Sequence, residues 1–290
     1  MQSRLDETTG LNLPFVQVHE FLDPTTGEYR ELFISDAKPS TGAAARLLVL
    51  LDGNLSAVPA ALMQHTRMER GLGNPPPCTV VGVGYPGVQF YDRARRSRDY
   101  LPPLPIGLDT SAWQGGRADA FAHFLDASLL PWLEARQGTA FSEVALFGHS
   151  YAGLFALYKL LHLPGRFDAF FSISPSLWWA NGWLLDQLPG AAGRCAGRTL
   201  YLGIGADERA MPEDDAQRQA LHQERDLQAR FARLVAELQA RHQCFTAETF
   251  AGEDHGSVLY PAVSRAVRWL MRPALGKHHD TDQHQNTNRS

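Results

Sequence analysis

The chain carries two kinds of apolar segment. Near the N-terminus, residues 14–21 (PFVQVHEF) and 28–37 (EYRELFISDA) alternate apolar with polar side chains around the turn-forming DPTTG, which predicts an antiparallel hairpin. Further along, the runs are continuous, as is typical of strands buried on both faces of a parallel sheet. These later strands are predicted at 45–53, 78–85, 143–148, 167–174, 199–205 and 245–252.

Segments with helical character lie between these strands. They are predicted at 58–71, 117–137, 153–163, 216–243 and 261–271. Alternating strands and helices predict an α/β fold: a mostly parallel, twisted central sheet with helices on both faces and the antiparallel hairpin at one edge. We expect a single domain over residues 1–275, followed by a polar tail, 276–290, that is disordered.

Composition and charge narrow the class of protein. The 290 residues include 44% hydrophobic side chains and carry a formal net charge of -4, which argues against a nucleic-acid-binding protein. No apolar run reaches 18 residues, and the N-terminal MQSRLDETTG has no apolar core of a signal peptide, so we expect a cytoplasmic protein without membrane insertion. The three cysteines lie far apart, in neither a disulfide nor a metal-binding pattern.

The stretch GHSYAG, residues 148–153, stands between a predicted strand and a predicted helix. This is the context of a nucleophile elbow, in which a sharp turn exposes a serine hydroxyl at the carboxyl end of a strand. Gly148 and Ala152 are the small neighbours that such a turn requires around Ser150. The sequence therefore predicts an α/β-hydrolase fold with Ser150 as nucleophile. The alternative is a serine that only caps the following helix.

A serine nucleophile requires a base and an orienting acid. His255 is the predicted base, because it stands in FAGEDHGSVLYP after the last strand and just before the final helix. Glu208 is the first candidate for the acid and Asp207 the second, since both follow the strand at 199–205. The alternative for either carboxylate is a solvated loop position.

Two backbone amides are candidates for the oxyanion hole. One is the N–H of Tyr151 at the start of the elbow helix, and the other is the amide of Asn54 in LLDGN, where Gly53 permits a tight turn. The alternative for this second stretch is that Asp52 and Asn54 only cap the helix that follows.

Four stretches together are similar to the esterase D-type superfamily of α/β-hydrolases: LLDGN, GHSYAGLFALYKLL, FDAFFSISPSLWW and GEDHGSV. Within it, the chain resembles the esterases of trilactone catecholate siderophores such as enterobactin, salmochelin and bacillibactin, over about residues 12 to 272. The resemblance implies Ser150 as nucleophile, His255 as base, and an oxyanion hole near Asn54 and Tyr151. Some members of this group lack a third acid and use a Ser-His dyad.

The charge pattern bears on the substrate. Arg93, Arg95, Arg96 and Arg98 occupy the expected loop after the strand at 78–85, on the serine's side of the sheet. A ferric tris-catecholate is a trianion with aromatic faces, and guanidinium groups attract anions and stack on rings. We expect Arg95, Arg96, Trp178 and Trp179 to bind substrate. The alternative is that the arginines pair with Asp92 and Asp99 and that the tryptophans belong to the core.

The expected activity is that of a serine esterase that hydrolyses ester or lactone bonds of ferric or free catecholate siderophores through an acyl-enzyme, without a cofactor or metal, and so aids iron release. Two alternatives remain. The first is another esterase of the superfamily, such as an S-formylglutathione hydrolase or a carbohydrate-ester hydrolase. The second is a hydrolase fold that binds a ligand or partner without catalysis.

Overall fold

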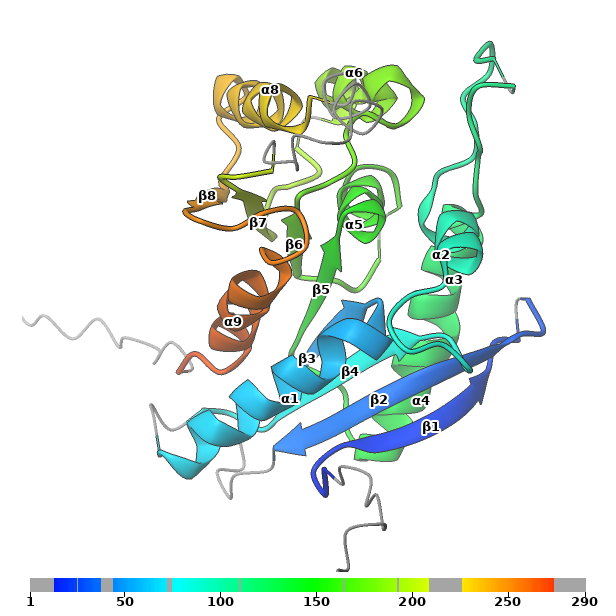
Figure 1. Cartoon of the computed structure of the whole chain (residues 1–290). Helices are drawn as coiled ribbons and strands as arrows, with labels where there is room; N and C mark the ends of the chain where they lie inside the picture. The colour runs from blue at the N-terminus through cyan, green and yellow to red at the C-terminus, as the bar shows by residue number, and fades with distance from the viewer. Residues whose placement is uncertain are drawn as a thin grey trace, which may run out of the picture.

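The computed structural model describes residues 13–24, 26–37, 44–71, 75–109, 111–163, 165–191, 193–208 and 226–273. Its centre is an eight-stranded sheet with the strand order β1-β2-β4-β3-β5-β6-β7-β8 (Figure 1). The strands are β1 (Gln17–Leu22), β2 (Tyr29–Ala37), β3 (Arg46–Leu51), β4 (Cys78–Gly84), β5 (Glu143–His149), β6 (Ala169–Ile173), β7 (Thr199–Gly205) and β8 (Thr246–Phe250).

The pairing of the strands is mixed. β1 runs antiparallel to β2, β2 runs antiparallel to β4, and every later pair in the sheet is parallel. This confirms the predicted mostly parallel sheet with an antiparallel hairpin at one edge.

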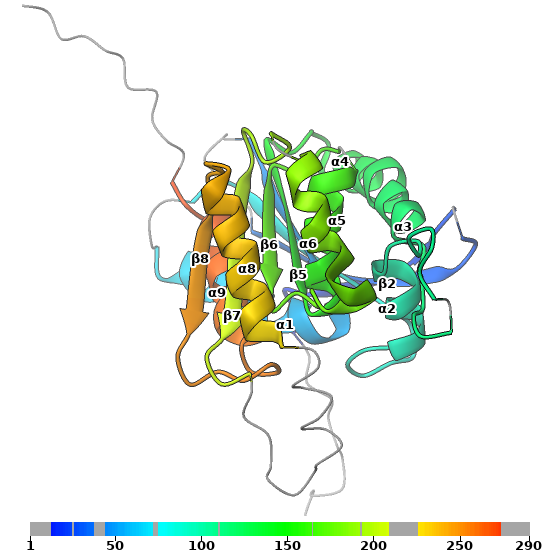
Figure 2. The ribbon, with the colours of Figure 1, turned by 90° about the horizontal axis from the view of Figure 1, so that it is seen from above.

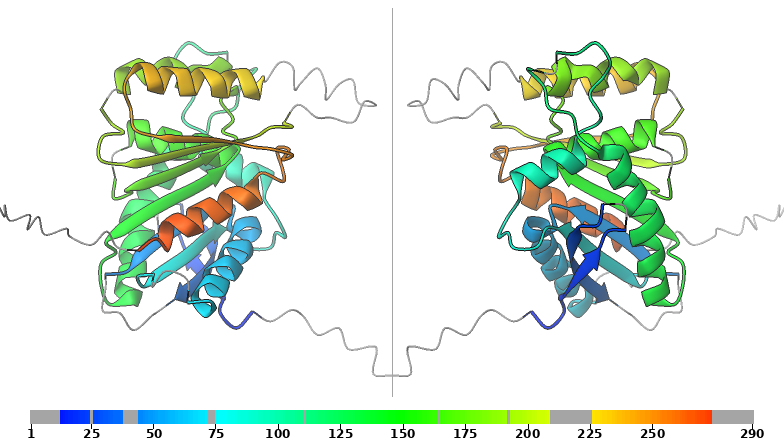
Figure 3. Two further views of the ribbon diagram at one scale, coloured as in Figure 1. Left: turned by 90° about the vertical axis from the view of Figure 1, so that its left-hand side faces the viewer. Right: turned by 90° about the vertical axis from the view of Figure 1, so that its right-hand side faces the viewer.

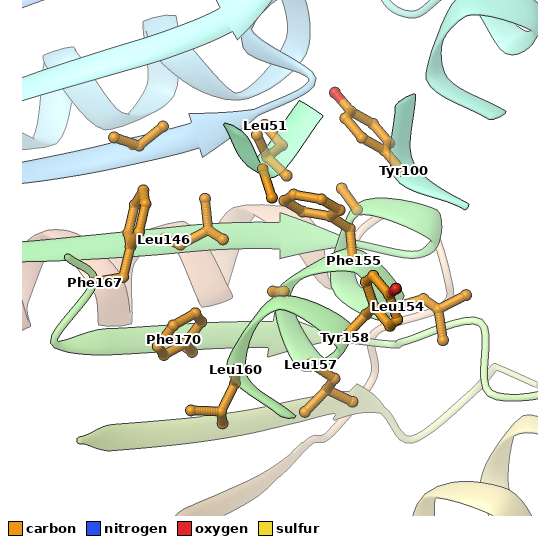
Figure 4. Close-up of a cluster of buried hydrophobic side chains, with 14 of the residues drawn as sticks. Leu51, Tyr100, Leu146, Leu154, Phe155, Leu157, Tyr158, Leu160, Phe167 and Phe170 are labelled. Atoms are coloured by element: carbon orange, nitrogen blue, oxygen red, sulfur yellow. The ribbon is translucent and has the colours of Figure 1, made fainter. Parts of the chain in front are cut away.

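Helices cover both faces of the sheet because the buried strands present apolar side chains in both directions. On β3, Leu47, Val49 and Leu51 pack into one core, whereas Leu48 and Leu50 pack into the other. Helices α1 and α9 lie over the second core, and α3, α4, α5, α6 and α8 lie on the opposite side (Figures 2 and 3). Figure 4 shows side chains of α5 packed against β5 and β6 in the larger core. The helices among the described residues are α1 (Gly53–Glu69), α2 (Arg93–Tyr100), α3 (Ala118–Phe124), α4 (Leu130–Gln137), α5 (Tyr151–His162), α6 (Trp183–Gln187), α8 (Leu227–Ala240) and α9 (Leu259–Leu270).

The helices depart from the sequence-based expectation in several places, including α6, which lies in none of the predicted helical ranges. α1 begins at Gly53, five residues before the predicted start, with Pro59 inside it. The helix predicted at 117–137 is interrupted by a π-helical turn, η1 (Leu125–Leu129), between α3 and α4. The arginine-rich segment expected as a loop forms α2. The first part of the helix predicted at 216–243 and the tail after residue 275 lie outside the described residues.

The carboxyl ends of the parallel strands all lie at the same end of the sheet, across the strand direction. Open α/β sheets bind ligands at this end. The residues that follow β3, β5, β6, β7 and β8 therefore come together at this end. None of the helices described above is both long and apolar enough to cross a bilayer.

Candidate active site

Ser150 stands on the turn from β5 to α5 in a conformation rarely adopted by a residue with a side chain. Its φ is 60° and its ψ is -117°, a strained region whose occupancy costs about 1–3 kcal/mol. The turn is tight enough that a Cβ on Gly148 would collide with the carbonyl group of Ala152. The local geometry is therefore that of a nucleophile elbow, with the serine hydroxyl held above the end of β5.

A row of hydrogen bonds connects three of the predicted residues. Nε2 of His255 lies 3.1 Å from Oγ of Ser150, and Nδ1 of the same ring lies 3.0 Å from Oε2 of Glu208. The three side chains come from the segments after β5, β7 and β8. Ser150 and His255 are 105 residues apart in the sequence. This arrangement can remove a proton from the serine hydroxyl and stabilise the resulting imidazolium.

The carboxylate of Glu208 is buried and has further donors. Oε1 accepts hydrogen bonds from the hydroxyl of Ser174 and, at 3.2 Å, from the N–H of Gly205. Asp207, the second candidate for the acid, is exposed, and its N–H donates to the carbonyl oxygen of Glu253. Of the two carboxylates, the structure brings only Glu208 to His255.

Ser174 and Ser176 are two site residues that the sequence does not predict. Both follow β6, the strand next to the elbow, and both are buried. Oγ of Ser176 lies 3.3 Å from Oγ of Ser150. The signal that could have found them is the same one that located Glu208 and His255, namely polar side chains directly after the carboxyl end of a buried strand.

Ser150 and His255 line a pocket of about 550 Å³. Its lining combines polar and aromatic side chains: Asp52, Leu55, Tyr91, Arg93, Arg96, Ser97, His149, Ser150, Tyr151, Ser176, Trp178, Leu227, His255 and Gly256. Two guanidinium groups and one carboxylate leave this lining with one net positive charge when its two imidazoles are neutral.

His149 packs beside His255 but is not part of the hydrogen-bonded row of Ser150, His255 and Glu208. Its ring lies 4.8 Å from the ring of His255, centroid to centroid. Burial, together with the nearby His255 and the charge of Arg96, holds the pKa of His149 well below its usual range. This imidazole is therefore neutral at pH 7.

The structure separates the four residues predicted to bind substrate into two pairs. Arg96 and Trp178 line the pocket. Arg95 does not, because its Nε donates to Asp92 at 2.9 Å and its Nη2 to the carbonyl oxygen of Pro86 at 3.0 Å. Trp179 is buried in the core, where its Nε1 donates to the carbonyl oxygen of Gln114 at 3.0 Å.

Arg96 and Trp178 have neighbours of the same chemical kind in the pocket lining. Arg93 lies beside Arg96 in the pocket lining and is exposed to solvent. The ring of Trp178 lies 5.8 Å from that of Tyr151, which also lines the pocket. The pocket thus offers both cationic and aromatic surface to a ligand.

The two candidate oxyanion donors occupy first turns of helices, where backbone N–H groups have no acceptor inside the helix. Tyr151 is the first residue of α5, and Asn54 is the second residue of α1. The side chain of Asn54 is engaged elsewhere: its Nδ2 donates to Glu31 at 2.8 Å, and its Oδ1 accepts from the N–H of Tyr85 at 2.8 Å. Of the N–H groups of Asn54, only the backbone amide thus remains a candidate for the oxyanion hole. Among the described residues, no group of three or more His, Cys, Asp or Glu side chains could hold a metal ion.

Comparisons with known proteins agree on one family. Residues 37–255 match the esterase family described as "Putative esterase". The siderophore enterobactin esterase of Emericella nidulans is 32% identical over 262 residues, which cover 81% of this chain and 85% of that protein. The ferri-bacillibactin esterase BesA of Bacillus subtilis is 28% identical over 293 residues, covering 92% and 95%. The structure of siderophore hydrolase EstB from Aspergillus nidulans matches with a TM-score of 0.79 at 25% identity, covering 92% of this chain and 98% of that one.

Proposed function

The chain belongs to this esterase family, and from that membership and its pocket we propose that it is a serine esterase of catecholate siderophores, with Ser150 as the nucleophile. The observation that carries the proposal is the hydrogen-bonded row of Ser150, His255 and Glu208 at a pocket lined by Arg93, Arg96 and Trp178. The similarity to proteins named for enterobactin and bacillibactin supports the siderophore as substrate.

In the first half of the reaction, Oγ of Ser150 attacks the ester carbonyl carbon while Nε2 of His255 takes the hydroxyl proton. Glu208 accepts the Nδ1–H hydrogen bond and stabilises the imidazolium. The negative charge that develops on the carbonyl oxygen is received by the N–H groups of Tyr151 and Asn54. The imidazolium then protonates the leaving alcohol, which in a trilactone remains attached to the acyl group.

In the second half, a water molecule attacks the acyl-enzyme. His255 takes its proton and returns it to Oγ of Ser150, which restores the enzyme and releases the linear acid. The same imidazole acts as base and acid in turn, so the reaction requires no cofactor.

The charge of the pocket favours an anionic ligand. A ferric tris-catecholate carries three negative charges, and the pocket lining has two guanidinium groups against one carboxylate. Arg93 is exposed at the pocket and suits long-range attraction, whereas Trp178 and Tyr91 supply flat surfaces for catechol rings.

Direct assays test this proposal. Wild type should convert enterobactin, with and without iron, to its linear trimer faster than it hydrolyses S-formylglutathione or p-nitrophenyl butyrate, as read by liquid chromatography. Ser150→Ala should lower kcat by about 10⁶-fold and leave the thermal unfolding midpoint nearly unchanged. Faster turnover of S-formylglutathione would assign the chain to the other esterase activity. Absence of any hydrolysis would make it a binding protein.

A cytoplasmic location completes the proposal. All three cysteines, Cys78, Cys195 and Cys244, are free thiols, as is usual in a reducing compartment. Cell fractionation tests the location directly.

A further inference from the structure

The pocket contains an ion pair that the proposed mechanism does not yet use. Nε and Nη2 of Arg96 donate to the two carboxylate oxygens of Asp52, at 3.1 and 2.9 Å. The side chains are largely buried, with 13% and 9% of their surfaces exposed. A two-pronged contact of this kind fixes the carboxylate in orientation as well as in position.

The same guanidinium packs on aromatic rings around the pocket. It lies 5.5 Å from the ring centroid of Tyr151 and 5.8 Å from that of Tyr100. The hydroxyl of Tyr100 in turn accepts a hydrogen bond from the N–H of Asp52, at 3.1 Å. Arg96 therefore contacts Asp52 and Tyr151 directly and is linked to Asp52 a second time through Tyr100.

Asp52 adopts a backbone conformation that needs such support. Its φ and ψ are both 51°, in the left-handed region, which costs a non-glycine residue about 1–3 kcal/mol. Asp52 directly precedes α1, and its carbonyl oxygen accepts the N–H groups of Leu55 and Ser56. The orientation of Asp52 thus sets the orientation of the first turn of α1, including the amide of Asn54.

We propose that Arg96 is a positioning residue of the esterase site: it holds the Asp52 turn against Tyr151, so that the amides of Asn54 and Tyr151 point to one oxyanion. This inference rests on the proposed function. It assigns Arg96 a role in the transition state, which differs from the attraction of an anionic substrate. The bidentate contact with Asp52 offsets much of the charge of Arg96, so the exposed Arg93 is better suited to attraction.

The test uses a neutral ester, which has no charge for an arginine to attract. With p-nitrophenyl butyrate, Arg96→Gln should lower kcat by about 10²-fold, the usual effect of misplacing or losing an oxyanion donor. KM should change by less than about threefold, because the ground-state ester does not depend on the hole. Arg96→Lys should recover little of kcat, since an ammonium group cannot make the two-pronged contact.

One further variant controls for damage to the fold, and two more test the contact between Arg96 and Asp52. Arg265 makes a similar two-pronged contact with Glu248, at 2.9 and 2.6 Å, outside the pocket. Arg265→Gln should therefore leave both kinetic constants unchanged. Asp52→Asn should resemble Arg96→Gln, and the double variant should be no slower than either single variant, because both remove one interaction.

Three outcomes would overturn the inference. The first is a kcat near the wild-type value in Arg96→Gln with only the KM for ferric enterobactin raised, which would make Arg96 a substrate-attracting residue. The second is full recovery of kcat by Arg96→Lys. The third is additive loss in the double variant. Because p-nitrophenyl butyrate reports on the hole, a wild type that ignores enterobactin but hydrolyses this ester would contradict the proposed substrate and leave the Arg96 test intact. A wild type that hydrolyses neither would overturn both.

Discussion

Glu208 is buried at the end of β7, and its carboxylate accepts hydrogen bonds from Ser174, Gly205 and His255. A glutamine there would present an N–H group either to His255 or to the two other donors. In the first case the imidazole would lose the acceptor that selects its tautomer, and in the second the amide N–H would face the N–H of Gly205. We therefore expect the role proposed for Glu208 to depend on its charge and not on its shape alone.

Glu208→Gln should lower kcat for p-nitrophenyl butyrate by about 10⁴-fold, as loss of the orienting acid does in other triads. Asp207→Asn is the matched control, because Asp207 is exposed one residue away and should change kcat little. The reverse ranking would transfer the role to Asp207. Nearly unchanged rates in both variants would indicate a Ser-His dyad.

His149 makes folding stability depend on pH. In the folded chain, burial and the nearby His255 and Arg96 keep its pKa well below the usual value. In the unfolded chain it takes up a proton near pH 6.5. The unfolded state thus binds more protons below that pH, so the free energy of unfolding decreases as the pH falls, by up to about 1.4 kcal/mol per pH unit from this one group.

Urea unfolding at pH 7 and pH 5 checks this expectation. The loss of stability between the two pH values should be smaller in His149→Phe than in wild type, because phenylalanine keeps a ring beside His255 but cannot bind a proton. The comparison uses the change with pH, so any constant cost of the substitution cancels. An equal loss in both proteins would show that His149 does not contribute to the acid sensitivity.

Among the described elements, α2 is a helix that hydrophobic periodicity could not predict. Its eight residues, RARRSRDY, have no apolar stripe. The helix is held instead by polar contacts: Asp92 caps its first turn, Arg96 pairs with Asp52, and Asp99 pairs with the buried Arg30 of β2. The two ion pairs join residues that are 44 and 69 positions apart in the sequence. No local pattern reveals such partners.

Two arginines of α2 have different proposed roles: Arg93 attracts an anionic substrate, and Arg96 positions the Asp52 turn. Arg93→Gln should raise KM for ferric enterobactin severalfold and leave kcat unchanged, because an exposed charge acts on encounter and ground-state binding. The wild-type advantage should shrink with added salt, since such attraction is screened over about 8 Å at physiological ionic strength. The neutral ester p-nitrophenyl butyrate, assayed in parallel, should show no effect of the substitution. A similar loss on both substrates would mean that Arg93 contributes shape and not charge.

At the scale of the whole molecule, the sheet explains why part of the site could be predicted. Continuous apolar runs fixed the parallel strands, and parallel strands bring their carboxyl ends together. This reasoning selected Ser150, Glu208 and His255, and the structure places His255 within hydrogen-bonding distance of both Ser150 and Glu208. Their catalytic roles stay predictions.

The rest of the site depends on side-chain directions that a strand assignment does not supply. Arg95 and Arg96 are neighbours in sequence, yet the turn of α2 directs only Arg96 into the pocket. In the same way, Trp178 faces the pocket while Trp179 packs in the core. The sequence could indicate both residues of each pair, but not which of the two faces the pocket.

The central claim, that Ser150 is the nucleophile with which the enzyme opens catecholate siderophores, has one direct test. The enzyme is titrated with a fluorophosphonate, the modified residue is located by peptide mass spectrometry, and enterobactin hydrolysis is measured at each degree of labelling. The account predicts one adduct, on Ser150, and a loss of hydrolysis in proportion to the labelled fraction. An adduct on another residue, or hydrolysis that persists when Ser150 is fully labelled, would contradict it.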